Sequence, residues 1–177
     1  MLHLATARRA ALAGDHAASG LELDAAASAA GDANSSIGIR VQIERVRAAL
    51  EHDDVAAAVA QLRMLAGQSV HLGEVPVRLK WLELEVAAAL RSGKIADAGA
   101  RYRESLAILK TTGRWGDAVV LHRLGARALS GSEAAAAKDI ADALLAQMLD
   151  DAPPESRTAL RETLARRERE ESGATHD

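Results

Sequence analysis

Apolar side chains recur with a helical period along most of the chain. After the polar break at residues 34–36, Ile39, Ile43, Val46 and Leu50 follow one another at i, i+4, i+7 and i+11. This spacing places all four on one face of a helix, because an α-helix turns once every 3.6 residues. The segment is therefore predicted to be an amphipathic helix that buries this face.

The opposite face of the same helix is charged. Arg40 stands four residues before Glu44, and Arg47 stands four residues before Glu51. Opposite charges at this spacing can pair along a helix surface. We expect two solvated ion pairs on the side that faces away from the core.

The same reading of the whole chain predicts nine helices and no strand. The predicted helices cover residues 2–13, 16–30, 37–52, 54–66, 76–92, 94–111, 115–130, 132–150 and 155–171. Residues suited to helix ends stand at these boundaries. Asp15, Asp53 or Asp54 and Ser132 suit helix starts, Pro76 and Pro154 suit first turns, and Gly93 and Gly131 suit helix ends.

The helices form a repeat of pairs. The short turns within the pairs begin at Gly14, Asp53, Gly93 and Gly131, which are separated by 39, 40 and 38 positions. A nearly constant period of this length is typical of helical repeat proteins, in which each pair buries its apolar face against the next pair. The predicted class is all-α.

The second helices share a small, large, small pattern, counted five, nine and twelve residues after the turn residue. Spacings of four and then three keep these positions on one face, where small side chains allow helices to approach closely. The small residues at the first position are Ser19, Ala58, Ala98 and Ala136. The large residues are Leu23, Leu62, Tyr102 and Ile140, and the third positions, small in three cases of four, hold Ala26, Leu65, Ser105 and Ala143.

This pattern resembles the second helix of tetratricopeptide (TPR) repeats. The best copy is residues 79–109, in which Trp81 and Leu84 look like first-helix positions of that family, and Ala98, Tyr102 and Ser105 look like second-helix positions. The period is longer than that of the standard repeat. The protein is thus similar to the long, degenerate TPR-like arrays in the helical domains of bacterial signal-transduction ATPases and regulators.

The resemblance implies a right-handed superhelical stack of about four antiparallel helix-turn-helix pairs. The TPR-like domain is expected over residues 2–150, with repeats at about 2–36, 37–75, 76–114 and 115–150. The charged segment 155–171 is expected to be a C-terminal capping helix, because repeat arrays need a polar end. Residues 172–177 are expected to form a disordered tail.

Composition excludes several classes of protein. An apolar content of 49% is too high for a disordered protein, and a net charge of −3 gives no general attraction for phosphates or acidic lipids. The sequence has no cysteine, and Arg8 and Arg9 interrupt the apolar stretch where the core of a signal peptide would run. We expect a cytoplasmic protein that binds neither nucleic acid nor membrane.

Chemistry typical of enzymes is missing from the sequence. No metal-binding His pair, phosphate-binding glycine loop or nucleophile elbow occurs, and acids two residues apart, such as Glu83 and Glu85, do not share a helix face. The histidines are expected to have structural or surface roles. They are His3, His16, His52, His71, His122 and His176. The sequence predicts no enzyme activity, cofactor or metal.

The first helices of the pairs are more basic than the second helices. They carry ten Lys or Arg against five Asp or Glu, whereas the second helices carry six against nine. In the resembling family the first helices line the concave binding face. The candidate partner-binding residues are therefore Arg8, Arg9, Arg40, Arg47, Arg78, Lys80, Arg123 and Arg127.

These residues would favour an acidic peptide or the free C-terminus of a polypeptide. The predicted function is a non-catalytic scaffold that binds a protein or peptide on its concave face. The immediate start of the first helix at Leu2 indicates a domain of a larger signalling or regulatory protein. Three alternatives stay open: the arginines only pair with nearby acids, the protein is a homo-oligomerisation domain such as a homodimer, or it binds a small effector molecule.

Overall fold

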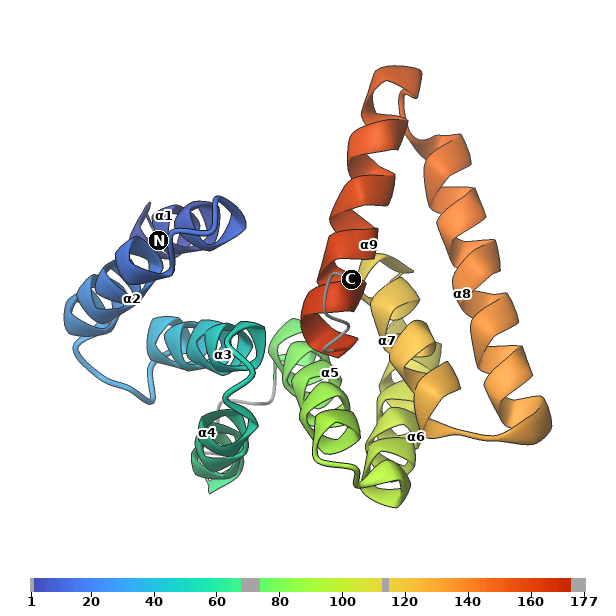
Figure 1. Cartoon of the computed structure of the whole chain (residues 1–177), viewed down its shortest axis with the longest axis horizontal. Helices are drawn as coiled ribbons and strands as arrows, with labels where there is room; N and C mark the ends of the chain where they lie inside the picture. The colour runs from blue at the N-terminus through green and yellow to red at the C-terminus, as the bar shows by residue number, and fades with distance from the viewer. Residues whose placement is uncertain (1, 68–73, 113–114, 173–177) are drawn as a thin grey trace. The chain divides into compact units, whose positions relative to one another are not determined.

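The computed structural model describes residues 2–67, 74–112 and 115–172, and this part of the protein is helical throughout, without a strand (Figure 1). The elements are α1 (Leu2–Leu12), α2 (His16–Ala30), α3 (Ser36–Glu51), α4 (Val55–Gly67), α5 (Val75–Arg91), α6 (Ile95–Thr112), α7 (Trp115–Ala128), α8 (Gly131–Asp151), the 3₁₀ turn η1 (Pro154–Ser156) and α9 (Arg157–Ser172). The all-α prediction is confirmed, and each predicted helix boundary lies within about two residues of the observed one. Residues 173–177 of the predicted tail, which include His176, lie outside the described residues. His71 also lies outside them.

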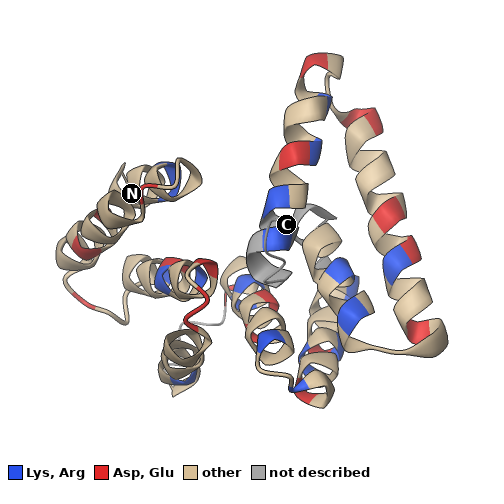
Figure 2. Ribbon diagram, viewed as in Figure 1, with Lys and Arg blue, Asp and Glu red and all other residues tan. Residues whose placement is uncertain are grey.

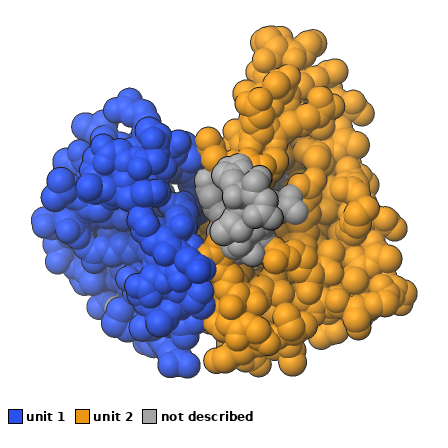
Figure 3. All heavy atoms as spheres, in the orientation of Figure 1, with its two compact units in different colours: residues 1–78 blue, residues 79–177 orange. Residues whose placement is uncertain are grey.

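The protein divides into two compact units, residues 1–78 and 79–177 (Figure 3). The first unit contains α1 to α4 and the first turn of α5, and within it α3 contacts α1, α2 and α4. In the second unit α7 contacts α6, α8 and α9. Consecutive helices therefore pack together from α1 to α4 and from α6 to α9, and some alternate helices, α1 with α3 and α7 with α9, also touch.

Three of the turns between paired helices have the same geometry. Gly14, Asp53 and Gly93 have positive φ angles of 77°, 58° and 70°. The N–H of the following residue, Asp15, Asp54 or Lys94, donates to the carbonyl five residues earlier at 3.0, 2.8 and 2.9 Å. This is the Schellman ending of a helix, in which a left-handed residue satisfies the last carbonyl groups. The repeat seen in the sequence thus includes a repeated turn.

Helix starts after these turns follow the predicted capping chemistry in two cases. The Asp15 carboxylate accepts a hydrogen bond from the Ala18 N–H, and the Asp54 carboxylate accepts one from the Ala57 N–H, both at 3.0 Å. The prediction that Ser132 caps a helix was wrong, because α8 begins at Gly131 and Ser130 is the residue before it. Pro154 lies in η1, so α9 begins after it, at Arg157.

The small, large, small register is buried in the first three second helices. Side chains at all nine positions are at most 5% exposed. These residues are Ser19, Leu23 and Ala26 in α2, Ala58, Leu62 and Leu65 in α4, and Ala98, Tyr102 and Ser105 in α6. The apolar content of these helices therefore faces inward where the repeat predicts it.

The fourth copy was predicted one residue out of register. Ala136, Ile140 and Ala143 are exposed, whereas Ala137 and Ala141 are buried. Ala137 and Ala141 lie 39 residues after Ala98 and Tyr102, the first two register positions in α6, so the period of 39 continues into α8. Gly131 misled the alignment because it begins α8, whereas Gly93 follows the end of α5.

The charged C-terminal segment packs on its neighbours. α9 contacts α7 and α8, and Leu164 is its one buried apolar side chain in the described part of that helix. Arg157 Nε donates to the Ala152 carbonyl at 3.1 Å, which satisfies a group beyond the end of α8. Few apolar side chains hold this helix, so its polar surface stays toward solvent.

The repeated turn predicts opposite effects at equivalent positions. Gly93→Ala should lower the free energy of unfolding by about 1 kcal/mol, because a Cβ is strained in the left-handed region. Asp53→Gly should raise it by about 0.5 kcal/mol by relieving the same strain. Urea denaturation followed by circular dichroism measures both changes.

Gly20→Ala is the matched control for this prediction. Gly20 lies within α2, and an added Cβ meets no atom within 4 Å. Alanine should therefore stabilise the helix there by about 1 kcal/mol. If Gly93→Ala also stabilised the protein, the left-handed turn would be wrong.

Candidate partner-binding surface

The eight basic candidates come from the first helices, as predicted, but they differ in exposure. Arg8 and Arg40 have about two fifths of their side chains exposed, at 43% and 44%. Arg47 is buried, and the Lys80 side chain is only 14% exposed. Arg9, Arg78 and Arg127 are exposed, and Arg123 is half-buried. Arg47 and Lys80 therefore lie inside the fold rather than on an open binding face.

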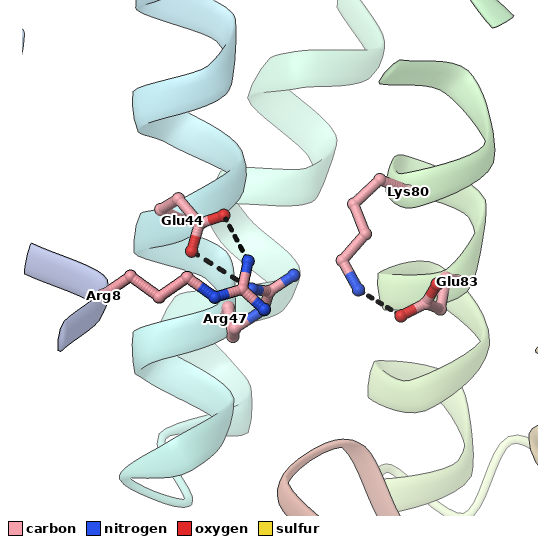
Figure 4. A network of polar contacts seen from close by, with 5 residues as sticks. All are labelled: Arg8, Glu44, Arg47, Lys80 and Glu83. Carbon is pink, nitrogen blue, oxygen red and sulfur yellow. Dashed lines mark hydrogen bonds and ion pairs between the residues drawn. The ribbon is translucent and has the colours of Figure 1, made fainter. Parts of the chain in front are cut away.

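Glu44 lies between two of the candidates (Figure 4). Its Oε1 is 3.7 Å from Arg8 Nη1, and its Oε2 accepts a hydrogen bond from Arg47 Nη1 at 3.2 Å. The packing of α1 on α3 brings Arg8 to this carboxylate. One acid thus offsets part of the charge of two arginines.

The expectation of a solvated Arg47 was wrong. Arg47 is only 6% exposed and bonds to Glu44, three residues earlier on the same helix. Arg40 Nη2 lies 3.9 Å from Glu74 Oε2, an acid from a distant part of the sequence. The sequence pattern considers only charges within α3, whereas in the folded protein the packing of other helices also determines which acids its arginines contact.

Lys80 is held by a buried acid. Its ammonium donates a hydrogen bond to Glu83, which is 1% exposed (Figure 4). Removing one member of a buried ion pair leaves an uncompensated charge, which is strongly destabilising. Lys80 therefore has a structural role whether or not it contacts a partner.

Charges of both signs are interspersed along the first helices. Figure 2 shows acidic and basic segments next to one another on α3 and α5. A mixed surface has a weaker long-range field than its count of basic residues implies, because neighbouring opposite charges cancel at distances larger than their spacing and salt screens what remains. Short-range contacts to exposed arginines are the recognition chemistry that this arrangement allows.

The second unit contains a polar cluster that the sequence did not reveal. Arg101 on α6 reaches Glu85 on α5, with Nε 2.8 Å from Oε2, and donates to Glu104 at 2.9 Å. Its guanidinium also lies 5.7 Å from the centre of the Trp81 ring. Burial outweighs the attraction of Arg101 and raises the pKa of Glu85 to about 7. The one feature of the sequence that could have indicated this cluster is the spacing of Trp81 and Glu85, which stand four residues apart on one helix face.

A buried hydrogen bond joins α6 and α7. The Tyr102 hydroxyl and His122 Nδ1 are 2.7 Å apart, and both residues are less than a tenth exposed. Burial raises the pKa of Tyr102 to about 12 and lowers the pKa of His122 below its usual value. The imidazole is therefore uncharged near neutral pH, and Nδ1 can accept a hydrogen bond from the phenol. His122 is a structural hydrogen-bond partner in this arrangement.

Comparison of the sequence and structure with protein-family models, curated proteins and solved structures finds no match. In the described ranges, no three His, Cys, Asp or Glu side chains come together as metal ligands would. None of the helices there is long and apolar enough to cross a membrane. Inferences about function therefore rest on the residues of this protein alone.

Gly125 is needed for the packing of Tyr102. A Cβ at this position would lie 2.4 Å from the Tyr102 ring. The ring is rigid and buried, so Gly125→Ala should destabilise the protein by about 1 to 3 kcal/mol. Adding Tyr102→Leu should recover part of that loss, in a double-mutant cycle measured by urea denaturation. Strictly additive effects would contradict the contact.

Glu85 and His122 should give opposite pH dependences of stability. The Glu85 pKa is about 7 when folded against 4.5 normally, so its stabilising effect is complete below pH 4.5 and is lost as pH rises through 7. The His122 pKa is lowered from 6.5, so the unfolded state binds this proton first and stability falls below pH 6.5.

Variants of the two residues test this sign. Glu85→Gln should stabilise the protein above neutral pH and have little effect near pH 4.5, the ordinary pKa of the group. His122→Asn should flatten the loss of stability below pH 6.5. Thermal unfolding across this pH range measures the slopes. Equal slopes in the variants and the parent protein would contradict the assignments.

Proposed function

We propose that the protein is a non-catalytic binding module whose helix pairs stack antiparallel as a right-handed, TPR-like superhelix. One observation carries this proposal: the same left-handed turn occurs three times, each followed by the same buried register. Contacts between alternate helices, α1 with α3 and α7 with α9, are what such a stack requires. Stacked helix pairs present extended surfaces, and these suit recognition of another protein.

The ionisable groups with shifted pKa values support binding rather than catalysis. His122 is bonded to Tyr102, and Glu85 lies against Arg101. Both arrangements join neighbouring helices, so they serve packing. A catalytic base would instead need to reach the proton of a bound substrate.

The proposed partner is a protein or peptide with acidic side chains or a free C-terminus. In the first unit Arg9, Arg40 and Arg78 are exposed on the first helices and can contact carboxylates directly. Arg47 supports this face from inside, because it holds Glu44 beside Arg8. The resemblance to helical arrays of bacterial regulators suggests a module of a cytoplasmic signalling or regulatory protein.

Charge reversal tests the face. A triple variant with Arg9→Glu, Arg40→Glu and Arg78→Glu should bind fluorescent acidic peptides with a free C-terminus about tenfold or more weakly than the parent protein does. Fluorescence anisotropy at low and moderate salt measures the change, which should shrink as salt screens the charges.

A matched control reverses three exposed cations that lie on the second helices or directly before one of them. The control variant carries Arg63→Glu, Lys94→Glu and Lys110→Glu, which change the net charge by the same amount as the first triple variant. This control should keep most of the affinity. Equal losses in the two triple variants would reject the first-helix face, and no peptide binding by the parent protein would reject the acidic partner.

Homo-oligomerisation is a second candidate, and one observation favours it. Three large apolar side chains of the first unit are widely exposed: Leu2 at 78%, Leu21 at 73% and Met64 at 60%. Self-association would cover such side chains, because removing apolar surface from water favours association. Light scattering at two protein concentrations separates the candidates, because a constant monomer mass would reject self-association.

A further inference from the structure

The outer face of α1 carries exposed apolar side chains. Leu2 is 78% exposed and Leu12 is 44% exposed, and the exposed residues Ala5 and Arg9 lie between them. Spacings of three, four and three residues place these four positions on the side of the helix opposite the buried Ala7. We call them the α1 stripe. Association with another surface would remove its apolar side chains from water, which is favourable.

The outer face of α2 carries a second stripe. Leu21 is 73% exposed, and Ala17, Asp24 and Ser28 are exposed on the same side of the helix. Spacings of four, three and four residues place these positions opposite the buried Leu23. We call them the α2 stripe. Each stripe thus combines a widely exposed leucine with one charged residue and with small side chains.

The charged residues of the two stripes have opposite signs. α1 contains two arginines and no acid, whereas α2 contains two acids and no Lys or Arg. Arg9 makes no ion pair with the described residues. Asp24 accepts a hydrogen bond from Arg45 at 2.5 Å, but its side chain is still 73% exposed, and a carboxylate can accept several hydrogen bonds. Arg9 of one copy can therefore bind Asp24 of another copy without displacing Arg45.

The stripes also match in their order of residues when the two helices run antiparallel. With Leu12 of one copy opposite Leu21 of the other, Arg9 comes opposite Asp24 and Ala5 comes opposite Ser28. Leucine then meets leucine, a cation meets an acid, and small side chains meet where the helices must approach closely. Two α1 stripes would match less well, because their contact would bring the arginines of both copies together.

We propose that the α1 stripe of one copy docks on the α2 stripe of a second copy. α1 packs on α2 (Figure 1), and each stripe lies opposite the buried face of its helix, so the two stripes of one copy point away from each other. The contact joins two different surfaces, so every copy can bind one neighbour on each side, which builds rings or open chains. This inference rests on self-association, the second candidate function, and names its surfaces.

The contact is small, because α1 has 11 residues and α2 has 15. Two short helices bury an area at the low end of protein interfaces, so the association is weak and depends on concentration. Sedimentation velocity of the full-length protein should show a mean mass that rises with protein concentration. The mass should fall as salt is added, because salt screens the pair of Arg9 with Asp24.

Two variants each disable one stripe. Leu12→Glu places an acid in the α1 stripe, and Leu21→Glu places one in the α2 stripe. Each variant alone should associate at least about tenfold more weakly than the parent protein, because the new carboxylate would lose water without gaining a partner. An equal mixture of the two should form a dimer that does not grow further. In that dimer the Leu21→Glu copy supplies the α1 stripe and the Leu12→Glu copy supplies the α2 stripe.

Exchange of the charges tests the ion pair. Arg9→Glu and Asp24→Lys should each weaken association about tenfold, and the double variant should recover most of the loss, because the pair is restored with its charges exchanged. Met64→Glu is the matched control. Met64 is 60% exposed on α4, outside both stripes, so this variant should associate as the parent protein does. Circular dichroism identifies any variant that has lost its fold.

Four outcomes would overturn the inference. A constant monomer mass would reject it together with the second candidate function and would leave the acidic-peptide proposal standing. Undiminished association of folded Leu12→Glu and Leu21→Glu variants would reject the two stripes, and self-association would stand. Failure of the mixed variants to form a dimer would reject the pairing of α1 with α2. A monomeric parent protein whose acidic-peptide binding weakens in Leu12→Glu would assign the α1 stripe to a peptide partner instead.

Discussion

The left-handed residue that closes a helix is the constraint on which the rest of the structure depends. At Gly14, Asp53 and Gly93 the backbone leaves one helix and begins the next after only three intervening residues. The following helix then starts at a fixed offset, so the residue five positions after the turn falls on the buried face. Because that residue is small, the two helices can approach closely. Turn geometry and core packing are therefore determined together.

Asp53 shows that this constraint is strong enough to hold a residue other than glycine. Its φ of 58° costs free energy for a side chain with a Cβ, although aspartate tolerates this region better than most residues. The next residue, Asp54, caps α4 through its carboxylate. The cap offsets part of the strain, so the acidic pair performs both functions of the turn.

Helices and turns could be predicted from the sequence because their causes are local. Apolar period, capping residues and glycines at helix ends all act within a few residues, and the observed boundaries follow them closely. The fourth register could not be found in this way. Gly131 also has a positive φ, but it begins α8 instead of following a helix end, and the sequence alone does not distinguish these positions.

The charged surface was predicted less well, because the partners of charged side chains are chosen by packing between helices. The sequence paired Arg47 with Glu51 as a solvated pair, whereas the folded protein buries Arg47 against Glu44, which also lies near Arg8 of α1. A count of basic residues on the first helices cannot show that such acids offset them. The basic residues that stay exposed can be recognised only once the contacts between helices are known.

Buried polar contacts have a further role in a core this poor in large side chains. Aromatic residues make up 2% of the sequence, so few bulky side chains interlock between helices. Smooth faces of alanine allow neighbouring helices to slide, because many registers bury similar apolar area. A buried directional bond between neighbouring helices, such as that of Tyr102 with His122, is satisfied in one register only. Such bonds add specificity that the apolar residues do not supply.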